Sequence, residues 1–136
     1  MRISLQVIVE TEGDTPATGT EIAQFEREGL DAGSLGLHLA EAKSLLSRLQ
    51  RTMVAAHVAE AVARTSVCPT CGAQLACKGH HHLVSRSAFG RLSIDSPRLY
   101  PYRQCKGDAP SFSPVTVFCL SGSVQNCSIS RSSSRH

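Results

Sequence analysis

Residues 39–72 read LAEAKSLLSRLQRTMVAAHVAEAVARTSVCPTCG, and this segment determines the expected architecture more than any other. Its first part, residues 39–65, contains no glycine or proline, and its apolar side chains recur at spacings of three and four. This pattern predicts one long amphipathic helix, with Glu41 placed to form a capping box after His38. We expect the apolar stripe to pack on a neighbouring hairpin rather than form a dimer seam, because its heptad pattern lasts only about two repeats. The stripe consists of Leu39, Ala42, Leu46, Leu49, Met53 and Ala56.

The residues before this helix predict that hairpin. Residues 2–10 alternate apolar and mostly polar side chains, as a half-buried strand does, and residues 11–19 are rich in Thr, Gly and Pro. Residues 20–28 alternate again and predict a second, antiparallel strand. Since an isolated hairpin is only marginally stable in water, it must pack on the helix. The apolar side chains of the first strand are Ile3, Leu5, Val7 and Val9.

After the helix, the segment Cys-Pro-Thr-Cys-Gly at residues 68–72 carries the sharpest chemical signal. Two thiolates separated by two residues can bind one tetrahedral ion, because the turn between them directs backbone N–H groups at the sulfurs. Gly72 supplies the positive φ that such a turn needs. We therefore predict a structural zinc site that includes Cys68 and Cys71. A redox role is disfavoured, because this motif follows a helix and precedes short strands.

The other half of the zinc site is incomplete in sequence. Cys105 is the third predicted ligand, and Tyr102 or Gln104 occupies the place where a partner cysteine would stand. The fourth ligand is open: Cys77 or one of the three consecutive histidines could supply it, since imidazole is an acceptable zinc donor. The plainer alternatives are a strand thiol and a polar turn. The histidines are His80, His81 and His82.

From residue 68 onward the sequence predicts short strands and turns. Strands are expected at residues 74–78, 83–89 and 91–94, with Gly79 and Gly90 as turn glycines. The Ser-rich end is nearly aperiodic, and we expect it to be disordered. The predicted fold class is α+β: an N-terminal β-hairpin, one long helix, a small zinc-ribbon-like β module and a disordered C-terminal tail. The corresponding predicted domains are residues 1–66, 67–117 and 118–136.

Charge is divided unevenly along the chain. Residues 1–60 hold nine acidic against five basic side chains, whereas residues 61–136 hold nine basic against two acidic ones. This asymmetry favours an anionic partner for the second half, nucleic acid first, and a solvated basic surface is the alternative. Presented on one face of a β-ribbon, the basic residues would bind phosphates in a salt-dependent way. The candidate nucleic-acid-binding residues are Lys78, Arg86, Arg91, Arg98 and Arg103.

Targeting and membrane signals are not expected. Met1 precedes a strand-like alternation, and apolar runs are far shorter than the roughly 18 residues that span a bilayer. The six cysteines therefore fit thiols or metal ligands in a reducing cytoplasm better than a disulfide framework.

Several segments in this order resemble the start of the ISKra-type insertion-sequence transposases, over residues 1–117. The segments are LAEAKSLL at 39–46, CPTCG at 68–72, KGHH at 78–81, FGRL at 89–92, SPRLY at 96–100 and SFSP at 111–114. The resemblance implies an accessory N-terminal region that precedes a longer catalytic domain, which uses acidic residues and divalent metal for DNA strand transfer. It implies DNA at the element ends as partner, with self-association or a partner transposase, and neither a membrane nor a small-molecule substrate. On this view the chain is not itself an enzyme.

The chain departs from that family at two places. Family members show two cysteines just after the Arg-Leu-Tyr step, where this chain has Tyr102 and, offset by a residue, Cys105. Residues 119–131 are compatible with codons that spell the family continuation in a shifted frame. The resemblance therefore implies an out-of-frame tail from about Phe118 and a truncated transposase. The alternatives are a small zinc-ribbon protein-interaction module or a non-functional pseudogene product.

Overall fold

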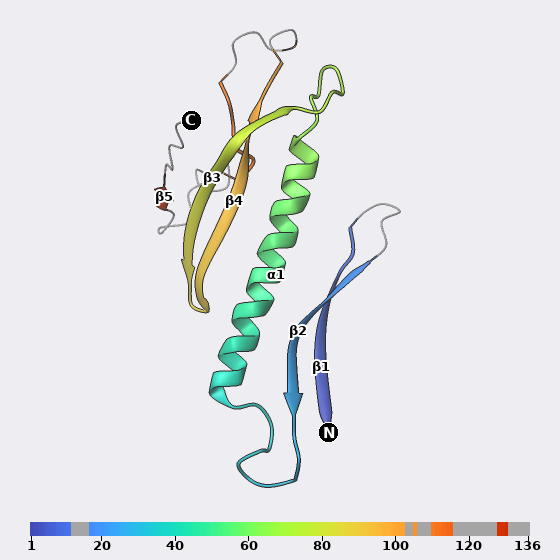
Figure 1. The fold of residues 1–136 in the computed structure, drawn as a ribbon, viewed down its shortest axis with the longest axis vertical. Helices are drawn as coiled ribbons and strands as arrows, with labels where there is room; N and C mark the ends of the chain where they lie inside the picture. Colours follow the sequence, from blue (N-terminus) through green and yellow to red (C-terminus); the bar gives the residue numbers. More distant parts are fainter. Residues whose placement is uncertain (12–16, 103–104, 106–109, 116–127, 131–136) are drawn as a thin grey trace. The chain divides into compact units, whose positions relative to one another are not determined.

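A computed structural model of the chain describes residues 1–11, 17–102, 105, 110–115 and 128–130 (Figure 1). Its elements are β1 (Arg2–Val9), β2 (Thr18–Glu26), α1 (Leu39–Thr65), β3 (Ala76–Ser87), β4 (Gly90–Tyr100) and β5 (Ser128–Ser130). The chain divides into two compact units, Met1–Ala56 and His57–His136, and the division falls within α1. The mixed α+β class predicted from the sequence is confirmed.

Strands β1 and β2 form the predicted antiparallel hairpin of the first unit. Ile3 lies opposite Phe25 and Leu5 opposite Ala23, but the next pair is Gln6 with Glu21. Ile22 is therefore the additional residue of a β-bulge, and it is buried together with Ala23. The bulge shifts the alternation of β2, so that Ala23 and Phe25 share a face with the apolar side chains of β1.

Helix α1 has the bounds that the sequence predicts. Its start has the glutamate half of the predicted capping box: the backbone N–H of His38 donates to Glu41 Oε2 at 3.0 Å. The first helical bond runs from Ala42 N–H to the carbonyl of His38 at 2.9 Å. Glu41 also accepts from the guanidinium of Arg27 at 2.7 Å. The Arg27 side chain binds the carbonyls of Ser34 and Gly36 as well, and thereby fixes the loop between β2 and α1.

The face of α1 that meets the hairpin differs from the predicted stripe. Leu45 lines a pocket with Leu5 of β1, and Arg48 Nη1 donates to the carbonyl of Ile22 at 3.3 Å. Leu46 lies about 100° around the helix from Leu45, because an α-helix has 3.6 residues per turn. As a result Leu39 (72% exposed), Leu46 (37%) and Met53 (48%) remain accessible. The predicted burial therefore fails for these three side chains, whereas Ala42, Leu49 and Ala56 of the same stripe are half-buried.

The second unit contains a sheet with strand order β4-β3-β5. Strands β3 and β4 form one long antiparallel hairpin, where the sequence predicted three shorter strands. Gly90, with φ +121°, follows the turn at Ala88 and Phe89 as predicted. Gly79, with φ +94°, does not form a turn and instead lies in a bulge within β3, between Cys77 and His80. A positive-φ glycine serves both structures, so the local sequence does not distinguish them.

The predicted disordered tail contains one short strand. Residues 128–130 form β5, which pairs antiparallel with residues 82–84 of β3. No pattern in the sequence indicated this pairing. The rest of the predicted tail, residues 118–127 and 131–136, lies outside the described residues.

A small core holds the second unit together. Leu83 and Leu92 are buried on one face of the hairpin, and Leu83 is only 1% exposed. Leu99 is buried on the other face, in a cluster with Cys68 and Leu75. The SFSP run packs against β4: Phe112 exchanges two backbone hydrogen bonds with Leu99. Ser113 donates to Ser96 Oγ at 2.5 Å, and both hydroxyls are buried. A buried hydroxyl needs such a partner, which explains the two serines.

Candidate metal centre

The Cys-Pro-Thr-Cys-Gly segment folds into a closed turn that follows α1. Gly72 N–H donates to the carbonyl of Cys68 at 2.8 Å, and Cys68 N–H donates to the carbonyl of Ala73 at 2.8 Å. Gly72 has φ +71°, the positive value predicted for it. Val67 then pairs with Gln74, and Leu75 N–H donates to the carbonyl of Ser66 at 2.7 Å. This short ladder fixes the turn and directs its backbone N–H groups inward.

Those N–H groups stabilise a thiolate at Cys68. The backbone amides of Cys71 and Thr70 donate to its sulfur and lower the pKa of the thiol to about 7. Cys68 is only 3% exposed and packs with Leu75 and Leu99. A pKa near neutral pH favours the thiolate of Cys68, and the thiolate is the form of cysteine that binds metal.

Cys105 reaches this turn because the β3–β4 hairpin returns the chain to its starting point. Cys77, near the start of β3, lies opposite Leu99, near the end of β4. Beyond β4, Cys105 N–H donates to the carbonyl of Tyr102 at 3.0 Å, and Cys105 packs against the cluster that contains Cys68. The hairpin thereby brings together two segments that are far apart in sequence.

The three predicted ligands therefore meet. The sulfur atoms of Cys68, Cys71 and Cys105 all lie within 4.8 Å of one another, and all three cysteines are free thiols. A hydrogen bond with Cys71, burial and the proximity of Cys68 raise the pKa of Cys105 to about 11. Sulfurs on a tetrahedral zinc with bonds of about 2.3 Å would lie roughly 3.8 Å apart. The donor set fits a thiophilic divalent ion, whose charge would relieve the repulsion among three thiolates.

The predicted candidates for a fourth ligand lie elsewhere. Cys77 is exposed, and its thiol donates to the carbonyl of Gly79 at 3.4 Å. His82 Nδ1 forms a 2.6 Å hydrogen bond with Asp95, and His81 Nε2 accepts from Arg98 at 3.1 Å. Among the residues that the structure describes, the sulfur cluster contains the three cysteines alone.

Two of the predicted nucleic-acid-binding residues come together at the tip of the β3–β4 hairpin. Arg86 and Arg91 are directly opposite cross-strand partners, and both are exposed. Neither guanidinium forms an ion pair with a described residue. Like charges directly opposite each other destabilise a hairpin, so this tip would gain from a bound anion.

The remaining predicted basic residues do not share that face. Side chains alternate along a strand, so Arg98, seven residues after Arg91, points to the other side of the sheet. There Arg98 donates to His81, and the ammonium group of Lys78 lies 5.5 Å from the ring centre of Tyr100. The predicted single basic face is therefore not observed. Arg86 and Arg91 lie on one face of the hairpin, whereas Lys78 and Arg98 lie on the other and contact neighbouring side chains. Arg103 lies outside the described residues.

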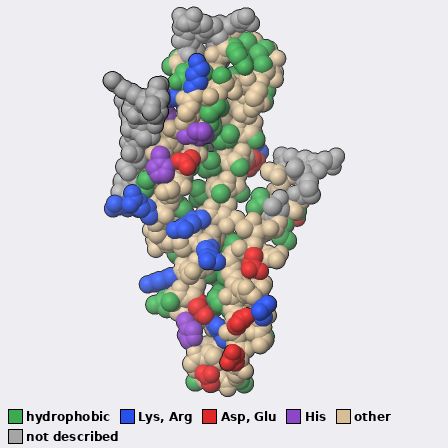
Figure 2. Space-filling view, viewed as in Figure 1, with side chains coloured by type: hydrophobic (Ala, Val, Ile, Leu, Met, Phe, Trp, Pro, Cys, Tyr) green, Lys and Arg blue, Asp and Glu red, His purple; other side chains and the backbone are tan. Residues whose placement is uncertain are grey.

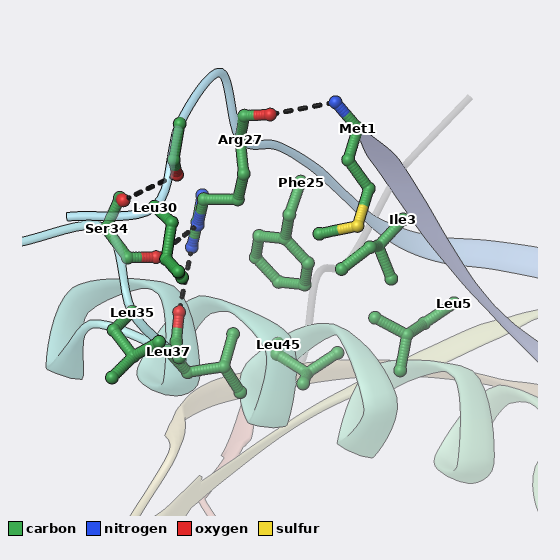
Figure 3. Close-up of a pocket in the computed structure, with 12 residues that line it drawn as sticks. Met1, Ile3, Leu5, Phe25, Arg27, Leu30, Ser34, Leu35, Leu37 and Leu45 are labelled. Atoms are coloured by element: carbon green, nitrogen blue, oxygen red, sulfur yellow. Dashed lines mark hydrogen bonds between the residues drawn. The ribbon is translucent and has the colours of Figure 1, made fainter.

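The first unit contains an apolar pocket of about 340 Å³ that the sequence did not predict. Figure 3 shows Ile3, Leu5 and Phe25 of the hairpin pointing toward Leu45 of α1, with the loop leucines on the opposite wall. The alternation in β1 indicated which side chains would face inward. The sequence could not indicate that they would line a pocket, because this depends on the loop conformation that Arg27 fixes through its bonds to Ser34 and Gly36. The loop side chains that line it are Leu30, Leu35 and Leu37.

Comparisons with protein-family models, with curated proteins and with solved structures gave no match to this chain. No helix in the described ranges is both long and apolar enough to cross a membrane.

Proposed function

We propose that this chain is an accessory region of an insertion-sequence transposase, which binds DNA through the β3–β4 hairpin and is stabilised by zinc at its three clustered cysteines. The observation that carries the DNA part is the pairing of Arg86 with Arg91 at an exposed hairpin tip. The resemblance of the sequence to ISKra-type transposases supports the same function. Strand cleavage and joining would belong to a catalytic domain of the transposase.

The arginine pair has the chemistry that a phosphate backbone requires. Duplex DNA carries one negative charge per roughly 1.7 Å of its axis, and guanidinium groups bind phosphates through paired hydrogen bonds. Two guanidinium groups facing each other across a ribbon could bind neighbouring phosphates, and binding would remove their mutual repulsion. Such interactions position a protein on DNA without reading its sequence.

Zinc would be held by Cys68, Cys71 and Cys105. When bound, it supplies a cross-link between the turn after α1 and the segment after β4, and it neutralises the thiolates. The two ends of the β3–β4 hairpin would then be tied together, which keeps the hairpin and its arginine tip in place. This role is structural, because the described sulfur cluster contains no carboxylate that could act as a general base.

The DNA proposal is tested by binding of a labelled duplex as salt is varied. The double variant Arg86→Ala/Arg91→Ala should bind more weakly, and the slope of log K against log salt should fall by about 0.9 for each phosphate that the variant no longer neutralises. Lys43→Ala, which removes an exposed, positively charged side chain from α1, should leave the slope unchanged. An unaltered slope in the double variant would exclude the hairpin tip as the DNA-binding surface.

A second candidate function is protein binding through the first unit. Hydrophobic side chains reach the surface in many places on the face shown in Figure 2, and most of the large exposed ones belong to residues 1–56. Several of them lie together as the lining of one pocket, and a contiguous apolar surface of this kind marks interaction sites in soluble proteins. These side chains are Met1, Ile3, Leu5, Leu30, Leu35 and Leu37. Binding of a protein partner there would persist at high salt, whereas DNA binding would weaken steeply.

A further inference from the structure

The chain supplies cysteines to the metal centre from two segments, one with Cys68 and Cys71 and the other with Cys105. In the second segment, Tyr102 stands where the first segment has Cys68. Tyr102 precedes Cys105 by three residues, as Cys68 precedes Cys71. In both segments the carbonyl of the leading residue accepts a backbone hydrogen bond: that of Cys68 from Gly72 N–H, four residues on, at 2.8 Å, and that of Tyr102 from Cys105 N–H, three residues on, at 3.0 Å. The bond from Cys105 to Tyr102 is that of a β-turn, whose end residues typically have Cα atoms less than about 7 Å apart.

The phenol of Tyr102 links this segment to the first turn. Its hydroxyl donates to the carbonyl of Gln74 at 2.9 Å, across 28 positions of sequence. Gln74 is the residue that pairs with Val67, immediately before Cys68. The peptide group that joins Gln74 to Leu75 therefore accepts from Tyr102 at its carbonyl and donates through Leu75 N–H to Ser66, just before Cys68.

We propose that Tyr102 is a positioning residue of the metal centre, whose hydroxyl-to-carbonyl bond holds Cys105 beside Cys68 and Cys71 in place of a fourth thiolate. Because the phenol is bonded to the Gln74 carbonyl, it is not a metal donor. A four-coordinate ion bound by Cys68, Cys71 and Cys105 would therefore need a fourth ligand other than Tyr102. This inference rests on the metal-binding part of the proposed function.

The test is a cobalt titration of the full-length chain, since Co²⁺ takes zinc-like sites and its thiolate charge-transfer absorbance reports the number of sulfurs bound. Tyr102→Phe removes one neutral hydrogen bond, so it should weaken cobalt binding by roughly 3- to 10-fold while the absorbance per ion stays that of three thiolates. Tyr100→Phe is the matched control: its hydroxyl has no hydrogen bond to a described residue, and its ring keeps the contact with Lys78. The control should bind cobalt as the wild type does.

Tyr102→Cys provides the second arm. A thiolate at this position should complete the site, raise the affinity for cobalt above that of the wild type and increase the charge-transfer absorbance per ion. Affinity unchanged in Tyr102→Phe, with a wild type that binds, would overturn the role of Tyr102 alone. A wild-type chain that binds no cobalt would remove the metal centre itself, and this proposal with it.

Discussion

The first unit, Met1–Ala56, and the second, His57–His136, differ in what holds them together. In the first, Ile22 and Ala23 are the buried side chains among the described residues, and Arg27 joins the loop to the helix by hydrogen bonds. The second unit buries Leu75, Leu83, Leu92 and Leu99, and it brings three sulfurs to one point. Apolar content alone therefore does not make a core. The first unit is rich in leucine, yet it leaves most of these side chains accessible.

Metal removal is the strongest way to test this difference. Structural zinc sites have apparent binding free energies of roughly 10–16 kcal/mol, so chelation should affect the second unit more than any single substitution. Hydrogen exchange should show reduced protection at residues 66–75 and at Leu99, while the amides of β1 and β2 change little.

The cysteines provide the matching variants. Cys71→Ser should reproduce the effect of the chelator, because it removes one of the three sulfurs. Cys77→Ser alters an exposed thiol outside the cluster and should leave metal content and exchange unchanged. Equal sensitivity of the two units to chelation would show that metal does not distinguish them.

The leucines of the two units should respond very differently to truncation. Leu83→Ala empties a site that is 1% exposed and should lower the free energy of unfolding by about 2–5 kcal/mol. Leu30→Ala truncates a side chain that is 90% exposed and should change it by less than about 0.5 kcal/mol. Chemical denaturation of each variant measures both values. A similar cost for the two would mean that Leu30 is covered in solution.

The sequence predicted the elements of these units more successfully than their packing. Helix α1 could be delimited because residues 39–65 lack glycine and proline, and its cap because Glu41 follows His38 by three. The packing face could not be predicted from the apolar spacing. Leu45 and Leu46 are equally apolar, and in the structure Leu45 lines the pocket with Leu5 while Arg48 donates to the Ile22 carbonyl.

In the candidate site, too, the local structure could be predicted from the sequence and the long-range arrangement could not. The spacing of Cys68, Cys71 and Gly72 predicted the first turn, because its geometry is local. Cys105 was also predicted as a ligand, but the way it reaches the turn was not, because a turn was expected at Gly79 where β3 continues through a bulge. Arg86 and Arg91 likewise face each other because of the register between β3 and β4. That register is fixed by the turn at Ala88 and Phe89.

Arg27 should matter more to the first unit than an ordinary surface arginine. Arg27→Lys retains the charge but loses the planar guanidinium, which binds Glu41 and three backbone carbonyls at once, so we expect a cost of about 1–3 kcal/mol. Arg2→Lys alters an exposed ion pair with Glu26 and should cost less than about 1 kcal/mol. Thermal unfolding and exchange at the start of α1 provide the readout. If the two variants unfold alike, Arg27 does not organise the unit.

Acid should weaken the first unit through Glu41, and this is the smallest of the expected effects. The hydrogen bond from Arg27, and then that from the His38 amide, hold the pKa of Glu41 below its ordinary value of 4.5. A carboxyl with a lowered folded-state pKa stabilises the fold above its unfolded pKa, and this stabilisation is lost as pH falls through the folded value.

Glu41→Gln should therefore reduce the loss of stability between neutral pH and pH values below 4.5. Asp31, whose pKa is lowered by its hydrogen bonds with Ser34, should retain part of the dependence. Glu28→Gln, an exposed control, should leave the pH profile of unfolding unaltered. A Glu41→Gln profile identical to that of the wild type would show that this carboxyl does not couple folding to pH.

The clustering of Cys68, Cys71 and Cys105 is tested most directly by native mass spectrometry of the chain purified without added metal. We predict one zinc ion per chain, absent from Cys71→Ser and retained in Cys77→Ser. A metal-free chain whose amide spectrum is unchanged by added zinc would rule out the metal centre, because the three sulfurs would then form no binding site.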